Sequence, residues 1–178
     1  ELVQKSTRDG WCVGYLGRVR EVESFQLLLE AVLLMEPKQR PRIRIAGDGV
    51  AFDSVSQLLN TAKINHDLQV EITGSFDTEE FPKIIQEVDV MYAMYSPSRG
   101  NILQGAIPVK MFDAAAHGVP SVVNSGCLMG EIAEHEEIGQ SVEWMNSAQL
   151  SENLFNLREV KVQLNTTSER ERKRFLEA

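Results

Sequence analysis

The feature that most constrains the fold of this sequence is a unit that recurs along it: a short apolar run, a turn containing glycine, and a segment with apolar residues at helical spacing. In the first unit, WCVGYL at 11–16 predicts a buried strand, and Gly17 with Arg18 begins a loop. A helix follows, with Ser24 as its expected N-cap and Pro37 beyond its end. Strands and helices alternating at this spacing predict βαβ units in a parallel sheet with right-handed crossovers.

The rest of the chain repeats the unit. We expect further strands at 42–46, 68–72, 88–92, 119–123 and 140–144, and helices at 52–62, from Thr78, at 109–117, 131–136 and 147–157. Pro108 suits the first helical position and Gly118 a left-handed helix end. The predicted fold class is α/β, a Rossmann-like parallel sheet with helices on both faces. The expected organisation is a lead segment at 1–10, one domain at 11–157, and a polar link with a charged C-terminal helix at 158–178.

Charge and composition exclude several classes of function. Lys and Arg number 18 against 26 Asp and Glu, a net charge of −8 in 178 residues, which disfavours nucleic acid as a partner. The longest apolar run, 27–35, contains Glu30 and is shorter than the roughly 20 residues of a membrane span. Cys12 and Cys127 lie far apart without zinc-ligand spacing, so we expect no metal site and a reducing, cytoplasmic setting. The first ten residues lack signal-peptide features, and we interpret the chain as part of a longer protein.

Ligands of open parallel sheets bind at the carboxyl ends of the strands. The loops expected at that edge are 14–20, 47–50, 74–77, 96–108 and 124–130. Gly17 and Arg18 in the first of these could bind a diphosphate, because glycine allows close backbone approach and a guanidinium pairs with phosphate oxygens. The same loop could equally be a simple turn. Its glycines lack the Gly-x-Gly-x-x-Gly spacing, so an NAD or FAD site is disfavoured.

Two later segments carry further candidates. Lys110 and Asp113 are three residues apart and project from the first turns of one expected helix, where they could face a ligand or form an ordinary surface ion pair. Glu131 could cap its helix or accept a hydrogen bond from a hydroxyl group. His117, beside Gly118, is interpreted as a favourable group at a helix C-terminus.

In this order, the motifs resemble the donor-binding half of GT-B glycosyltransferases, the glycosyl transferases group 1 family. The resemblance rests on the segments GYLGR at 14–18, LLLEA at 27–31, IAGDG at 45–49, VEITG at 70–74, VDV at 88–90, PS at 97–98, KMFDAAAHGVP at 110–120 and GCLMGEI at 126–132. It covers roughly residues 11–145 in register.

The resemblance implies a retaining, hexosyltransferase-like enzyme that takes a nucleotide-diphosphate sugar as substrate and needs no metal or other cofactor. This chain would be the donor-binding domain, inactive in transfer without an N-terminal acceptor-binding domain, and the whole protein could be peripheral to a membrane. By position, Gly17, Arg18 and Lys110 would meet the donor diphosphate, Gly74, Ser75, Phe76 and Asp113 the nucleoside, and Gly126, Gly130 and Glu131 the sugar and diphosphate. No catalytic residue is assigned.

Three departures from the family pattern leave alternatives open. Glu23-Ser24 stands where the family usually has a basic residue and a glycine, and Gly105 stands where it has the first of two glutamates. Asp113 replaces the glutamate of a Pro-x-Lys-x-Phe-Glu variant. Arg20, Arg99 or Lys110 could compensate for the lost charge. The alternatives are a degenerate nucleotide-binding or scaffold module of the same fold and one half of a nucleotide-sugar epimerase.

Overall fold

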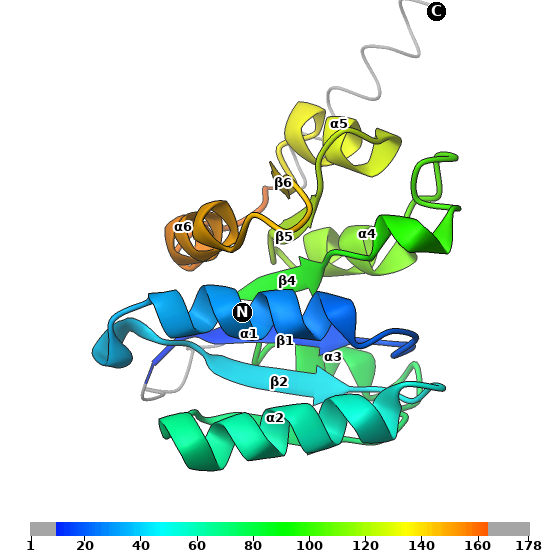
Figure 1. The fold of residues 1–178 in the computed structure, drawn as a ribbon. Coiled ribbons are helices and arrows are strands. Elements are labelled where there is room, and N and C mark those ends of the chain that lie inside the picture. The colour runs from blue at the N-terminus through cyan, green and yellow to red at the C-terminus, as the bar shows by residue number, and fades with distance from the viewer. Residues whose placement is uncertain (1–9, 164–178) are drawn as a thin grey trace, which may run out of the picture.

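The computed structural model describes residues 10–163 and has a six-stranded parallel sheet at its centre (Figure 1). The strands lie in the order β3-β2-β1-β4-β5-β6, with every neighbouring pair parallel. Their bounds are β1 Cys12–Leu16, β2 Arg42–Ala46, β3 Val70–Thr73, β4 Val90–Ala93, β5 Ser121–Asn124 and β6 Gly139–Val142. This confirms the predicted α/β class.

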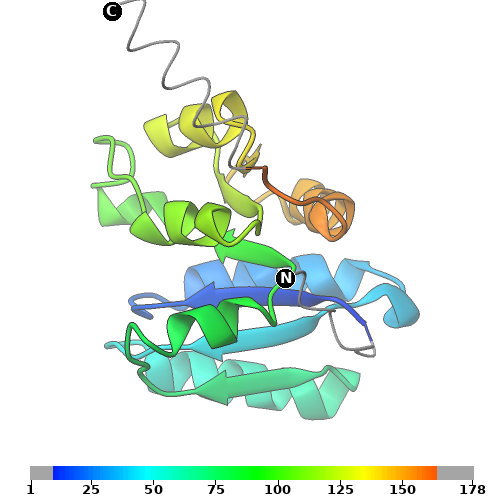
Figure 2. The same cartoon turned by 180° about the vertical axis from the view of Figure 1, so that it is seen from behind.

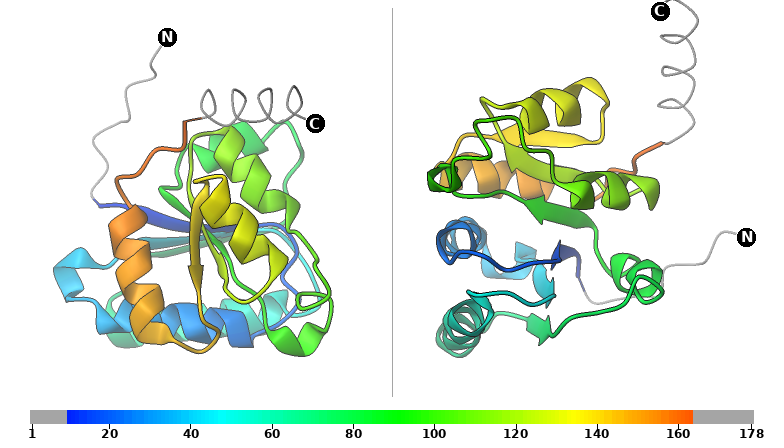
Figure 3. Two further views of the ribbon diagram at one scale, coloured as in Figure 1. Left: turned by 90° about the horizontal axis from the view of Figure 1, so that it is seen from above. Right: turned by 90° about the vertical axis from the view of Figure 1, so that its right-hand side faces the viewer.

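Between and after the strands, residues 10–163 form six α-helices and two short 3-10 turns. The helices are α1 Glu23–Leu34, α2 Phe52–His66, α3 Phe81–Ile85, α4 Val109–Ala116, α5 Leu128–His135 and α6 Ser147–Leu157, and the turns are η1 Pro37–Gln39 and η2 Pro97–Arg99. Helices α1, α2 and α6 cover one face of the sheet, and α3 and α4 cover the other (Figure 2 and Figure 3). Helix α5 packs beside β5 and β6. Helices therefore flank both faces, as the sequence predicts.

The sheet is buried between two apolar layers, which is why its strands are apolar on both sides. All five residues of β1 are buried. One core cluster contains Phe25 and Leu28 of α1 together with strand residues, and the smaller one lies under α3 and α4, around Met91 and Ala114. Gly14 at the centre of β1 has a packing role, because a Cβ there would collide with the side chain of Val88.

The strand order places a topological switch point between β1 and β4. From β1 the chain moves to β2 and β3 on one side, and from β4 it moves to β5 and β6 on the other. The connections therefore leave β1 and β4 in opposite directions, so the loops after these two strands diverge and leave a crevice at the carboxyl edge.

Four predicted helix starts are wrong by one to three residues. Helix α1 has Val22, not Ser24, at its N-cap; Ser24 is buried inside the helix, where its carbonyl accepts a hydrogen bond from the Tyr92 hydroxyl at 2.6 Å. Helix α4 has Pro108 as its N-cap rather than its first residue.

The other two wrong starts are those of α3 and α5. Residues 78–80 form a turn, closed by a hydrogen bond from the Asp77 N–H to the Glu80 carboxylate at 2.9 Å, and the helix begins only at Phe81. Helix α5 begins at Leu128, three residues before the expected start at Glu131, because the chain turns at Gly126 (φ +68°).

The ends of the chain limit what the structure says of the predicted organisation. Residues 158–163 leave α6 as a turn and an irregular segment, and the Val162 N–H donates to the Gly118 carbonyl at 3.1 Å. The predicted charged helix lies mostly at 164–178, and the lead at 1–9, both outside the described residues. Within residues 10–163, no helix has the length and apolar character needed to cross a membrane.

Candidate functional site

A cavity of about 820 Å³ opens at the carboxyl edge of the sheet. Its walls come from the end of β1 and the following loop (15–20), from residues 76–82, from the loop after β4 (95–107), and from α4 with its caps (108–117). The loops that follow β1 and β4 both contribute, so the cavity lies at the topological switch point.

The backbone fixes the wall formed by the loop after β1. The N–H groups of Gly17 and Val19 donate to the carbonyls of Ala46 (2.8 Å) and Asp48 (2.6 Å) in the neighbouring segment. That segment needs glycine, because a Cβ at Gly47 would collide with the carbonyl of Gly17. The predicted loop 47–50 therefore supports the site from behind and is absent from the cavity lining.

The cavity is strongly cationic in a chain whose net charge is −8. Among the described residues, its lining contains four basic side chains and one carboxylate: Arg18, Arg20, Arg99 and Lys110, with Asp113. The field in a cleft is set by its nearest charges, so this cavity favours an anionic ligand. Arg18 is exposed, with its Nε 3.8 Å from the Asp48 carboxylate, and is free to reorient toward such a ligand.

Lys110 has the most unusual environment of the four. Its Nζ is shielded from solvent and has no hydrogen-bond partner among the described residues. It lies 3.3 Å from the ring centroid of Tyr15 and 5.5 Å from that of Tyr95, so the aromatic faces stabilise the cation only in part. Burial, with a smaller contribution from the charge of Arg99, lowers the pKa of Lys110 to about 7.

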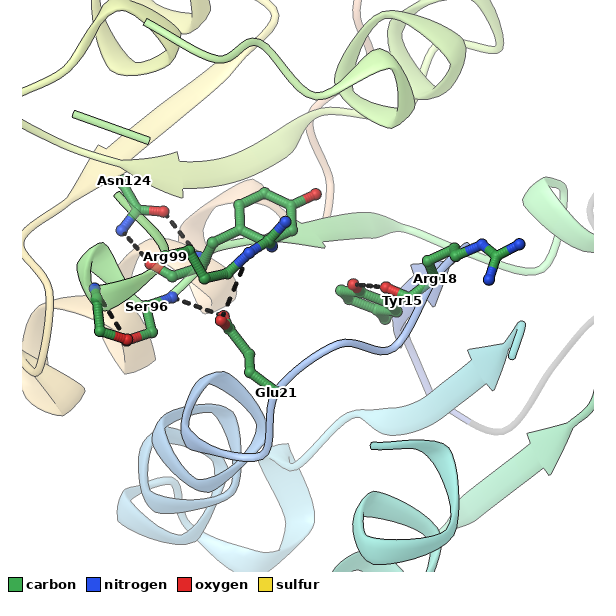
Figure 4. Close-up of polar contacts among 8 residues, drawn as sticks. Tyr15, Arg18, Glu21, Ser96, Arg99 and Asn124 are labelled. Carbon is green, nitrogen blue, oxygen red and sulfur yellow. Dashed lines mark hydrogen bonds and ion pairs between the residues drawn. The ribbon is translucent and has the colours of Figure 1, made fainter. Parts of the chain in front are cut away.

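The two tyrosines are themselves held in place. The Tyr15 hydroxyl donates to the Arg18 carbonyl at 2.6 Å (Figure 4). The side-chain amide of the buried Asn124 makes two hydrogen bonds to the backbone of Tyr95, accepting from its N–H and donating to its carbonyl, both at 2.8 Å. The aromatic floor beneath Lys110 is therefore fixed by the loop after β1 and by the end of β5.

Arg99 is held at the cavity wall by an acidic residue that lies behind it. Glu21, just before α1, accepts a hydrogen bond from the Ser96 N–H at 2.6 Å and pairs with the Nε of Arg99 at 3.8 Å (Figure 4). The Cζ of Arg99 lies 5.0 Å from the ring centroid of Tyr95. Burial raises the pKa of Glu21, an effect opposed by the Ser96 hydrogen bond and the charge of Arg99.

The other end of the cavity is aromatic. Phe76 and Phe81 lie 6.1 Å apart between ring centroids, and Phe81 meets the ring of His117 edge-on at 5.4 Å. The Nδ1 of His117 is 2.9 Å from the backbone carbonyl of Asp113, and both residues line the cavity. This end can accommodate a flat, weakly polar group, with a carboxylate nearby to accept hydrogen bonds.

The structure brings half of the predicted site residues to this cavity. Those that line it are Gly17, Arg18, Phe76, Lys110 and Asp113. Gly74 and Ser75 are exposed just after β3, and Gly126, Gly130 and Glu131 lie after β5 and in the first turn of α5; none of these five lines the cavity. A Cβ at Gly130 would lie 2.6 Å from the carbonyl oxygen of Asn124, so this glycine permits close packing of α5 on β5.

Several residues of the site are not singled out by their sequence pattern. Tyr15 lies in the strand predicted at 11–16, and His117 is interpreted only as a helix end. Tyr95 and Glu21 fall outside every predicted strand and ligand-binding loop. From the sequence, Arg20 and Arg99 are candidates only as compensating charges, and the structure places both at the cavity. Within residues 10–163, no three His, Cys, Asp or Glu side chains come together in a way that could hold a metal ion.

Comparison with a family model gives a match over most of the chain. The model described as glycosyl transferases group 1 matches residues 11–159. No curated protein sequence matches the chain.

Solved structures share the fold at low sequence identity. The catalytic domain of cholesterol-alpha-glucosyltransferase from Helicobacter pylori aligns with a TM-score of 0.62 at 18% identity, over 91% of each chain. The C-terminal domain of LpcC, a glycosyl transferase group 1 family protein from Francisella tularensis, aligns with a TM-score of 0.61 at 20% identity, over 86% of this chain and 80% of that one.

Longer chains match in part. HepE (Alr3699) from Anabaena, in complex with UDP and glucose, aligns with a TM-score of 0.65 at 14% identity over 96% of this chain. This chain spans 49% of the HepE chain and 44% of that of the lipopolysaccharide outer core galactosyltransferase WaaB. The sheet and its helices therefore match one half of a GT-B glycosyltransferase.

Proposed function

This chain belongs to the glycosyl transferases group 1 family, and on that premise we propose that its cavity binds the nucleotide part of a nucleotide-diphosphate sugar, as the donor-binding domain of a retaining, hexosyltransferase-like enzyme. The observation that carries the proposal is the pairing of a cationic wall with an aromatic end in one cavity. A nucleoside diphosphate has the same two parts, an anionic group and a flat base.

The diphosphate is assigned to the cationic wall. Gly17 lets the backbone approach closely, Arg18 is exposed and able to pair with phosphate oxygens, and Lys110 is a buried amine without a carboxylate partner. When the bond between the anomeric carbon and the diphosphate oxygen breaks, its electron pair stays on the diphosphate. The same cations then stabilise the added charge, a role that requires no metal ion.

The nucleoside is assigned to the aromatic end. Phe76 offers a ring face for the base, with the backbone of Gly74 and Ser75 beside it as hydrogen-bonding groups, and the Asp113 carboxylate can accept hydrogen bonds from ribose hydroxyls. Two HepE structures that match the fold hold UDP and a third holds UDP-glucose, which supports a nucleoside diphosphate or its sugar as the ligand class. We assign Gly126, Gly130 and Glu131, outside the cavity lining, to the sugar beyond the diphosphate.

Transfer requires more than this cavity. The acceptor site is assigned to an N-terminal domain, since the chain spans about half of HepE and WaaB, and the chain alone is expected to bind donor without transferring sugar. For the whole protein we propose a cytoplasmic location, peripheral to a membrane.

The alternative of a degenerate module rests on Glu23 and Gly105. The sequence pattern predicts that Glu23 repels a diphosphate, yet this residue is exposed at the start of α1 and does not line the cavity. This placement favours the donor-binding proposal. The epimerase alternative is separated from transfer by analysing the products of the full-length protein.

The test is a calorimetric titration of this chain at low salt with a panel of nucleoside diphosphates and their sugars. Saturable binding of one nucleotide, weakened in Arg18→Ala and in Asp113→Ala, is the expected result and identifies the base. A folded protein that binds no member of the panel would contradict the proposal.

A further inference from the structure

Glu21 is an acidic side chain buried at a position where burial is costly. Its side chain is 10% exposed, and its Oε2 is shielded from solvent with no hydrogen-bond partner among residues 10–163. Its Oε1 accepts the Ser96 N–H at 2.6 Å, and its Oε2 faces the Nε of Arg99 at 3.8 Å. A carboxylate incurs a desolvation cost in such a place, so it is retained only where its contacts matter to the fold or to the site.

Both contacts of Glu21 are to the loop after β4. Ser96 and Arg99 belong to the loop that forms one wall of the cavity, 75 or more positions away from Glu21 in the sequence. Glu21 itself comes from the loop after β1 and is absent from the cavity lining. The residue therefore joins the two loops of the switch point from behind, without being able to touch a ligand in the cavity.

Arg99 is the group that this contact presents to the cavity. Its side chain is 22% exposed and lines the cavity. The cations of Arg99 and Lys110 both lie near the ring of Tyr95. Two cations beside one ring repel each other, which is reflected in the contribution of Arg99 to lowering the pKa of Lys110. An anion between them would relieve that repulsion.

We propose that Glu21 is a positioning residue that holds the Arg99 guanidinium at the cavity wall, and that Arg99 binds the diphosphate together with Lys110. This inference rests on the proposed function and deepens it, because it adds an anion-binding arginine and the acid that orients it. Glu21 acts through its charge on Arg99 and through its hydrogen bond to Ser96.

One variant separates the charge that Glu21 places opposite Arg99 from its hydrogen bond to Ser96. In Glu21→Gln the side-chain oxygen can still accept the Ser96 N–H, but the negative charge opposite Arg99 is lost. Because burial raises the pKa of Glu21, its ionised form is disfavoured in the folded state, and a neutral isostere is expected to leave the melting temperature unchanged or raise it. Weaker ligand binding in a protein of equal or greater stability is an outcome that a purely structural role does not give.

The experiment measures binding of inorganic pyrophosphate and of UDP to this chain at pH 7 by calorimetry. The variants are Glu21→Gln, Arg99→Gln, the double variant and Arg99→Lys, each checked by thermal melting. Glu23→Gln is the matched control, because Glu23 is a nearby acid that is exposed and makes no contact with the cavity.

The expected result is a loss of about tenfold in affinity for both probes in Arg99→Gln, as for a charge-assisted hydrogen bond, and partial recovery in Arg99→Lys. Glu21→Gln is expected to weaken binding about threefold to tenfold alone and less than about twofold in the Arg99→Gln background. Glu23→Gln should bind like the wild type.

Two results would overturn the inference. Unchanged binding in Arg99→Gln, or an effect of Glu21→Gln that is as large in the Arg99→Gln background as in the wild type, would contradict this inference while leaving the proposed function intact. Absence of binding by the folded wild type would contradict both. Should Glu21→Gln fail to fold, Glu21→Asp takes its place: the shorter carboxylate draws back from Arg99, and weaker binding in Glu21→Asp that disappears in the Arg99→Gln background supports the inference, whereas an equal effect in both backgrounds contradicts it.

Discussion

The ammonium nitrogen of Lys110 lies 3.3 Å from the centroid of the Tyr15 ring, shielded from solvent and without a hydrogen-bond acceptor in the described part of the chain. A cation over a tyrosine face gains about 1–2 kcal/mol when it is desolvated, less than full hydration of an ammonium provides. Because the lost hydration is only partly replaced, burial lowers the pKa of Lys110 to about 7. The charge of this group near neutral pH therefore depends on what enters the cavity.

Replacing Lys110 with methionine should stabilise the fold at neutral pH. Between pH 7 and 10.5 the unfolded chain binds a proton at Lys110 that the folded chain does not, so the free energy of unfolding of the wild type rises with pH across this window. Lys110→Met removes that dependence. We expect a gain of about 1–3 kcal/mol at pH 7 and below, the scale of an unpaired buried polar group, which shrinks toward pH 10.5.

Urea unfolding of both proteins at about pH 6.5, 8 and 9.5, values chosen to span the window of linkage, measures this difference. If the difference in free energy of unfolding between the wild type and Lys110→Met were the same at all three pH values, Lys110 would not titrate differently in the folded and unfolded states.

Binding of a nucleoside diphosphate should take up a proton above pH 7. An anion beside Lys110 raises the pKa of its amine, so the affinity for UDP is expected to fall by up to about tenfold per pH unit as the pH rises above 7. The phosphate itself has its second ionisation near pH 6 and is fully charged in this window. Burial raises the pKa values of Tyr15 and Tyr95 well above the window, so they do not contribute.

Calorimetry in buffers of different ionisation enthalpy counts the protons taken up at about pH 8, inside the same window. Lys110→Met should abolish the uptake, while His117→Gln, which removes the imidazole of the cavity wall, should preserve it. Equal uptake in Lys110→Met would assign the proton to another group.

Asp113→Asn should affect the nucleoside and spare the phosphate. Asp113 lines the cavity one helical turn before His117, and a hydrogen bond from a hydroxyl to a charged acceptor is worth about 1.5–3 kcal/mol. We expect about a tenfold loss in affinity for UDP and no change for inorganic pyrophosphate, measured by calorimetry. An equal loss for both probes would place Asp113 at the phosphate end instead.

Gly47→Ala should destabilise the fold by about 2 kcal/mol or more, because the new Cβ collides with the Gly17 carbonyl and the backbone has φ +152°. Urea unfolding measures the loss. Gly74→Ala is the control, since a Cβ there meets no atom within 4 Å. If Gly47→Ala and Gly74→Ala had the same free energy of unfolding, the fold would not depend on the close approach of Gly47 to the Gly17 carbonyl.

The sequence predicts most of this fold because its signals are local and repeated. Each strand is a short apolar run that must be buried on both faces, and each helix has its own apolar stripe. The end of α4 illustrates this: Gly118 is expected in the left-handed region and has φ +75°. Ser24 fails as an N-cap because its burial against β4 places it inside the helix, and burial outweighs a cap signal worth about 1 kcal/mol.

The site is less predictable, because it is assembled across the sheet. Arg18, Lys110 and Asp113 can be expected near one another, since each follows the carboxyl end of a strand or begins the helix after it. The contacts of Glu21 with Ser96 and of Asn124 with Tyr95 span 75 and 29 positions. No local pattern encodes such pairs, and they depend on which strands become neighbours.

The hydrogen bonds from Gly17 and Val19 to the segment after β2 have a further consequence for binding. They give the loop after β1 its final conformation before any ligand arrives, so this wall loses little conformational freedom when a ligand docks against it. The backbone of this wall is thus preorganised, while the exposed side chain of Arg18 stays free to adjust to the ligand.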